Sequence, residues 1–263
     1  MLTFTDAQLN AWLATLLYPL ARILGLIATA PVFNNAAIPV NLRLITGIAI
    51  ALALAPVLPT HAGVDPASWG GLMVLLQQSL IGIALGFTMR VVFAAVDVAG
   101  ELIGMQMGLS FAVFYDPQNA AQSPVVAEVM GLMALLIFLA VNGHLMMVGL
   151  LAQSFDTLPI AGGSIGAHGW RTLTQWAATL FSTGVLMALP MIAALLVTNI
   201  ALGVLTKAAP QLNLFAVGFP ITIVVGFVVL ALGMPYFAPT LERAFEMGYE
   251  AMNNVMAAGA VQR

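Results

Sequence analysis

Six apolar stretches alternate along the chain with shorter links that are polar or rich in proline and glycine. They cover approximately residues 11–30, 44–57, 72–96, 125–153, 173–206 and 221–237. Most approach the length of about 20 residues that a helix needs to cross the hydrocarbon core of a bilayer. Because unpaired backbone groups are too costly in hydrocarbon for an open sheet, the pattern predicts an all-α, membrane-type protein. We expect about six hydrophobic segments arranged as helical hairpins within a single domain, residues 1–263.

Two of these segments carry residues that disfavour a simple crossing. Arg22 lies inside the first segment. Its Leu and Ile residues favour insertion by roughly 4 kcal/mol, whereas a central arginine costs about 3 kcal/mol on the same scale. We therefore expect Arg22 to face protein or water rather than lipid. The fifth segment is too long for one crossing, and Pro190 predicts a kink in it.

The third segment changes character after Val96, where charged residues join its helical pattern. At 100° per residue, Asp97 and Glu101 each fall within about 20° of Arg90, so all three lie on one helix face. One interpretation is an ion cluster in which Arg90 offsets the repulsion between the two carboxylates. The other is a contact with a partner subunit or a polar pathway.

Glycine recurs at every fourth position in the same region. Gly100, Gly104 and Gly108 form a stripe of small residues, and Gly82 and Gly86 repeat the spacing one segment earlier. Such a stripe lets another backbone approach closely. We expect this helical run to end at Asp116–Pro117, because proline disfavours helix at the residue before it.

The stretch GMQMGLSFAVFYDPQNAAQ, residues 104–122, fits neither an ordinary spanning helix nor an ordinary solvated loop. It is too rich in glycine and methionine for the first and too apolar for the second. The C-terminal tail, about residues 238–263, differs again, since its Glu and Arg residues predict a short amphipathic or solvated helix.

Composition strengthens the membrane assignment and excludes several functions. The chain is 62% hydrophobic and 6% charged, with a mean hydropathy of +1.04, whereas a soluble domain is about 25% charged. A net charge of −3 and scattered Lys and Arg residues argue against nucleic acid as a partner. With no cysteine there is no thiol chemistry or Cys-based metal site. The N-terminus lacks the basic region of a secretory signal, so we expect the first segment to be retained.

The sequence offers little that predicts an enzyme. Ser110 and His144 fit an intramembrane serine protease poorly, because Ser110 is not followed by the usual glycine. His144 beside Asn142 is more typical of a hydrogen-bonded packing element than of a metal ligand, since no second ligand stands at helical spacing. We therefore predict no catalytic, metal or cofactor site. Two classes fit the sequence: a stand-alone small-molecule transporter or channel, whose broken helices bind a substrate, and a subunit of a larger pore.

Four stretches together resemble the FliR/SctT family of type III secretion export-gate proteins, and in particular its flagellar members. The similarity spans nearly the whole chain, and the order and spacing of the stretches make it specific. The four are PVFNNAAIPVNLR from Pro31, GELIGMQMGLSFAVFYDPQ from Gly100, NGHLMMVGLLAQSFDTLPI from Asn142 and NIALGVLTKAAPQLNLFAVGFPI from Asn199.

The resemblance implies a place in a ring with FliP-like and FliQ-like subunits, beside other export-apparatus membrane proteins. That ring would form the entrance through which unfolded flagellar proteins leave the cell, in the bacterial inner membrane at the flagellar basal body. It also implies that the segment 104–122 plugs the pore. The candidate plug residues are Met105, Gln106, Met107, Gly108, Leu109, Ser110, Phe111, Phe114 and Tyr115. The candidate residues for packing against other subunits are Arg90, Asp97, Gly100, Glu101 and Gly104.

Overall fold

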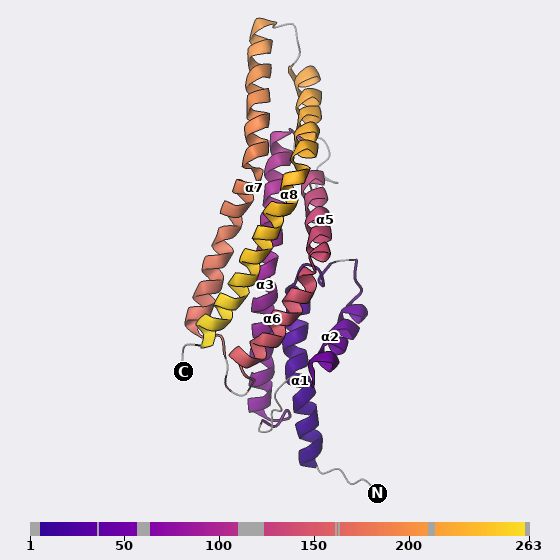
Figure 1. Cartoon of the computed structure of the whole chain (residues 1–263), viewed down its shortest axis with the longest axis vertical. Coiled ribbons are helices and arrows are strands. Elements are labelled where there is room, and N and C mark those ends of the chain that lie inside the picture. The colour runs from indigo at the N-terminus through magenta and orange to yellow at the C-terminus, as the bar shows by residue number, and fades with distance from the viewer. Residues whose placement is uncertain are drawn as a thin grey trace. The chain divides into compact units, whose positions relative to one another are not determined.

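The computed structural model describes residues 6–35, 37–56, 64–109, 124–160, 162, 164–209 and 214–260. All regular structure in this part of the chain is helical, which confirms the all-α prediction. The helices are α1 (Asp6–Thr29), α2 (Val40–Leu54), α3 (Trp69–Gln106), α5 (Val125–Ala140), α6 (Gly143–Thr157), α7 (Ala167–Ala208) and α8 (Leu214–Ala260) (Figure 1).

The described parts of the predicted apolar segments are helical, but the fourth, residues 125–153, is not one helix. It is divided into α5 and α6, which are bent by 66° at the break between them. Few of the helices could cross a membrane. Among the described residues three helices qualify by length and composition, namely α3, α7 and the part Gly218–Ala260 of α8. A fourth is possible if α5 and α6 count together as one broken span. The part Ala14–Thr29 of α1 is also apolar, and α2, Val40–Leu54, is a shorter apolar helix.

Helix α8 is longer than the sequence pattern predicts. The tail expected to form a separate short helix is instead the continuation of α8, which contains Pro220, Pro235 and Pro239. A proline removes one backbone hydrogen bond, whereas ending the helix in apolar surroundings would leave several groups without partners. Helix α7 likewise continues through Pro190. The kink expected at that residue stays a prediction.

The chain forms two compact units. The first comprises Met1–Val91, Asn142–Ala177 and Phe245–Arg263, and the second comprises Val92–Val141 and Ala178–Ala244. Helices α3, α7 and α8 each contribute residues to both.

In the first unit, glycines allow α1 and α3 to pack with their backbones close together. A Cβ on Gly82 would overlap the carbonyl oxygen of Arg22, and one on Gly86 would overlap the hydroxyl of Thr29. The contact is reciprocal, since a Cβ on Gly25 of α1 would lie only 2.5 Å from the carbonyl oxygen of Ser79. The close approach predicted from the spacing of Gly82 and Gly86 is therefore confirmed.

The side chain of Arg22 is completely buried in this unit and faces protein, as predicted. Its Nε donates a hydrogen bond to Oε1 of Gln78 in α3 at 2.7 Å. Its Nη1 donates to the carbonyl oxygen and to the hydroxyl of Ser154 in α6, at 2.8 and 2.9 Å. Its Nη2 donates to the carbonyl oxygen of Leu158 at 2.7 Å. One guanidinium group therefore joins three helices.

The position of Arg22 at the end of α6 explains how a cation is tolerated there. The last carbonyl groups of a helix lack partners within the helix and carry a partial negative charge. Arg22 donates to one of these carbonyls, that of Leu158, and also to the carbonyl of Ser154, which already accepts from the N–H of Leu158. The guanidinium also lies over the ring of Phe155, 4.1 Å from its centroid, in a cation–π contact.

In the second unit, α3 packs closely against both α5 and α7. A Cβ on Gly100 would overlap the backbone of Ala127 in α5. On another side of α3, a Cβ on Gly184 of α7 would lie 2.8 Å from the carbonyl oxygen of Ala95. Phe93 adds an edge-to-face contact with Phe138 of α5, with the ring centroids 5.7 Å apart.

Replacing Arg22 with alanine should lower the free energy of unfolding by about 3 kcal/mol or more, because several buried acceptors would lose their donor. Denaturant titration of the helical circular dichroism signal in detergent would measure this. Arg171→Ala is the matched control, since Arg171 is exposed and should be nearly neutral. Equal stability of both variants would contradict the role assigned to Arg22.

Replacing Gly100 with alanine should destabilise the chain by about 2 kcal/mol, because the added methyl group would force α3 and α5 apart. Gly104→Ala is the control one turn along the same face. There a Cβ would meet Val126 at an ordinary contact distance of 3.8 Å. We expect this control to be neutral or stabilising, since alanine favours helix over glycine. The melting temperatures of the two variants measure the effect. A lower melting temperature for Gly104→Ala than for Gly100→Ala would show that Gly100 is not the closest contact between α3 and α5.

Candidate functional site

The C-terminal end of α3 has a defined capping structure and leads into the segment singled out from the sequence. Gly108 adopts a left-handed backbone conformation with φ of 84°. The N–H of Gly108 donates to the carbonyl of Met105, and the N–H of Leu109 donates to the carbonyl of Gly104, both at 3.0 Å. This pair of bonds is the Schellman motif, in which glycine supplies the positive φ.

The prediction that the helical run continues to Asp116–Pro117 was wrong, because α3 ends at Gln106. Gly108 interrupts it. The signal was present in the sequence, since glycine just past the last helical residue is the commonest helix end. The regular spacing of Gly100, Gly104 and Gly108 concealed it by suggesting one continuous stripe.

Helix α8 holds the end of α3 through Met107. This side chain is completely buried. A Cβ on Gly226 of α8 would lie 2.6 Å from both Cε and Cγ of Met107, so the methionine occupies the space left by the glycine. The hydroxyl of Thr222 lies 3.1 Å from the carbonyl oxygen of Met107 and 2.9 Å from that of Phe219 in its own helix, so this terminal carbonyl shares a donor. Both backbone and side chain are therefore anchored.

The described part of the candidate plug divides into exposed and anchored residues. Met105 is 54% exposed and Met107 is fully buried, while Gln106 and Leu109 are half-buried. Ser110, Phe111, Phe114 and Tyr115 lie outside the described residues. Their assignment to a plug stays a prediction.

The three charged residues of α3 are all exposed. Arg90, Asp97 and Glu101 are exposed within this chain, whereas most of their immediate neighbours on the helix are buried. Asp97 points toward α5, since its Oδ1 would lie 3.4 Å from a Cβ on Gly131. A place on the outer surface is compatible with contacts to another subunit, and this role stays a prediction.

The glycines proposed for packing against other subunits lie at a contact within the chain. Gly100 and Gly104 are buried and face α5. Gly100 is the closer of the two, because only its Cβ would overlap the α5 backbone. The structure thus accounts for Gly100 without a second chain, and any contact with another subunit stays a prediction.

Sequence reasoning missed the residues of α8 that anchor Met107. Gly218, Thr222 and Gly226 are spaced by four, and this stripe of small residues is the same signal that was recognised in α3. Pro220 lies within this stripe and is typical of a break between helices, so the sequence pattern did not indicate a packing face there.

His144 differs from the expectation of a hydrogen-bonded packing residue. It lies in the first turn of α6, after Asn142, whose φ of 57° is left-handed. The Nδ1 atom of His144 is buried and has no hydrogen-bond partner among the described residues. In this part of the chain, no three His, Asp or Glu side chains are grouped so that they could hold a metal ion.

The two long C-terminal helices expose much apolar surface. In the most apolar 18-residue stretch of α7 only 17% is buried within the chain, and in that of α8 only 11%. The side chains of Leu186, Val197 and Leu232 are 66–70% exposed. A soluble monomer rarely exposes contiguous apolar patches of more than a few hundred Å², so this surface requires lipid or other chains around it.

Comparison with known proteins gives a family and relatives that agree with one another. The family described as bacterial export proteins, family 1, matches residues 13–248. The flagellar biosynthetic protein FliR of Escherichia coli (strain K12) is 43% identical over 257 residues, which is 98% of each chain. That of Pectobacterium carotovorum is 43% identical over 256 residues, 97% of this chain and 98% of the relative. FliR of Bacillus subtilis is 29% identical over 241 residues, 90% of this chain and 92% of the relative.

These matches confirm the family resemblance found in the sequence. They cover nearly the full length of both chains, so the similarity is not confined to one motif. Together with the apolar helices, they identify a membrane-embedded protein. The chain belongs to family 1 of the bacterial export proteins, the type III export family that includes the flagellar biosynthetic FliR proteins.

Proposed function

We propose that this chain is a subunit of the flagellar type III protein export gate in the bacterial inner membrane, at the flagellar basal body. There it forms, with FliP-like and FliQ-like subunits, the entrance pore for unfolded flagellar proteins. The observation that carries the proposal is 43% identity over 98% of both chains to a protein named for flagellar biosynthesis. The role is structural, so we assign no catalytic residue.

The exposed surface of the chain supports a place among other subunits. The apolar face of α7 and α8 is too large to be left in water. Helix α2 is apolar, but with 15 residues it is too short to qualify as a span. A chain with such a helix suits an assembly in which neighbouring subunits cover what lipid does not.

We further propose that the segment 104–122 is the plug of this pore. Glycines permit a bent backbone, methionines fill irregular gaps, and Phe111, Phe114 and Tyr115 are bulky enough to obstruct a narrow lumen. The anchoring of Met107 by Thr222 and Gly226 supports this role, because a plug must be held firmly where it begins. A hydrophobic constriction of this kind holds back water and ions yet yields to an arriving polypeptide.

Extraction of the C-terminally tagged chain from its native membrane in mild detergent should yield a large complex. We expect mass spectrometry of this complex to detect FliP-like and FliQ-like subunits. A monomer or homo-oligomer without them would contradict the export-gate proposal and favour a stand-alone small-molecule transporter or channel.

Deleting Leu109–Phe114 should make cells leak ions or small solutes while the complex still assembles, because the bulk that closes the lumen is lost. Ion-sensitive dyes would record the leak, and the yield of the purified complex would report assembly. Replacing the same six residues with glycine and serine keeps the chain length and tests bulk alone. An unaltered leak in both variants with intact assembly would rule out the plug.

A further inference from the structure

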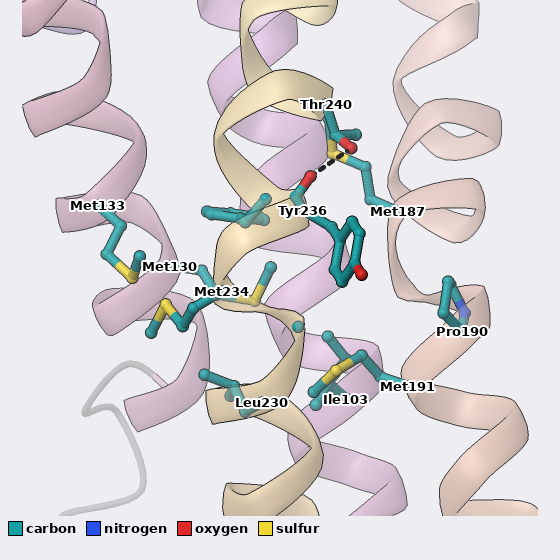
Figure 2. A pocket seen from close by; sticks show the side chains of 12 residues that line it. Ile103, Met130, Met133, Met187, Pro190, Met191, Leu230, Met234, Tyr236 and Thr240 are labelled. Atoms are coloured by element: carbon teal, nitrogen blue, oxygen red, sulfur yellow. Dashed lines mark hydrogen bonds between the residues drawn. The ribbon is translucent and has the colours of Figure 1, made fainter.

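An apolar cavity lies within the second unit, among α3, α5, α7 and α8 (Figure 2). Its volume is about 250 Å³. One third of the chain's 15 methionines line it, and they come from three helices. These residues are Met130, Met133, Met187, Met191 and Met234.

Water is a poor occupant of this cavity. A buried water needs two to four polar partners, and the walls are mainly methionine, proline and aliphatic side chains. The two lining residues that carry hydroxyl groups are Tyr236 and Thr240, and both are exposed. The Thr240 hydroxyl already donates to the carbonyl oxygen of Tyr236 at 2.9 Å, as the dashed line in Figure 2 shows. An apolar group therefore suits the space better than water.

The surroundings of the cavity indicate which apolar group is available. Its walls include α7 and α8, the two helices with the least buried spans. Beside lining residues, Leu189 is 47% exposed and Leu232 is 70% exposed. Around a helix that crosses a bilayer, a surface of this kind meets lipid acyl chains.

We propose that the cavity binds one acyl chain of a membrane lipid. A helix of a neighbouring subunit, about 10 Å wide with its side chains, is too bulky for this space, whereas a single flexible hydrocarbon chain can enter it. Methionine suits such a ligand because its side chain is unbranched, polarizable and able to adapt to an irregular shape.

Gly233 offers a way to fill the cavity selectively. It lines the wall, and a Cβ placed there would meet Sδ of Met191 at 3.7 Å, an ordinary contact distance. A leucine at this position would fit its first carbon and extend into the space. Gly203 of α7 is the matched control, since a Cβ there would meet nothing within 4 Å.

The test uses the full chain with the subunits that accompany it, reconstituted in phosphatidylethanolamine and phosphatidylglycerol vesicles. A trace of phospholipid carries a photoreactive diazirine in its acyl chain, and labelled peptides are mapped by mass spectrometry after irradiation. We expect label on peptides containing Met130 and Met191, saturating at one lipid per chain. Gly233→Leu should reduce this label about tenfold, as expected when about two methylene groups lose their contacts. Gly203→Leu should leave it unchanged.

Two results would overturn the proposal. Equal labelling of the cavity peptides in both leucine variants would place the lipid on the outer surface. Absence of label in the wild-type complex would mean that a side chain of a neighbouring subunit fills the space. If Gly233→Leu fails to accumulate, Met191→Phe fills the same cavity from α7 and should reduce the label likewise. Because lipid rather than exported protein is followed, the result is independent of the leak experiment.

Discussion

The burial of Arg22 is the constraint on which the arrangement of the first unit depends. Its guanidinium leaves water completely and therefore requires acceptors within the protein. Gln78, Ser154 and Leu158 supply them, so α1, α3 and α6 can pack in only one register that satisfies the cation. The glycines at the α1–α3 contact make that register possible, because any larger side chain at Gly82 would overlap the backbone of α1. Charge and packing thus select the same arrangement.

In the first unit a charged group is buried, whereas in the second unit apolar surface is left exposed. Helices α7 and α8 bury little of their most apolar parts within the chain. They continue through their prolines because an interrupted backbone would expose unpaired polar groups to an apolar environment. Both proposals follow from this surface. Other subunits would cover part of it in an export gate, and a lipid chain would complete the methionine-lined cavity.

The anchored end of α3 connects the fold to the proposed plug. Met107 is fixed by Thr222 and Gly226 of α8, and the left-handed Gly108 turns the chain immediately afterwards. If the segment 104–122 is the plug, this anchor would hold the helix that carries it while a polypeptide passes. The exposed Met105 lies on the same last turn. Met105 is therefore on the exposed side of this turn, whereas Met107, two residues later, is on the side packed against α8.

The sequence by itself determined the helical class, the family, the protein-facing Arg22 and the close approach at Gly82 and Gly86. These follow from local composition and spacing, which a single segment displays. It did not determine where α3 ends, what anchors Met107 or that a cavity forms among four helices. Thr222 and Met107 are separated by 115 residues, so no local pattern reports their contact. Only the tertiary structure decided these features, because they depend on which faces of distant helices meet, and apolar helices offer many nearly equivalent faces for packing.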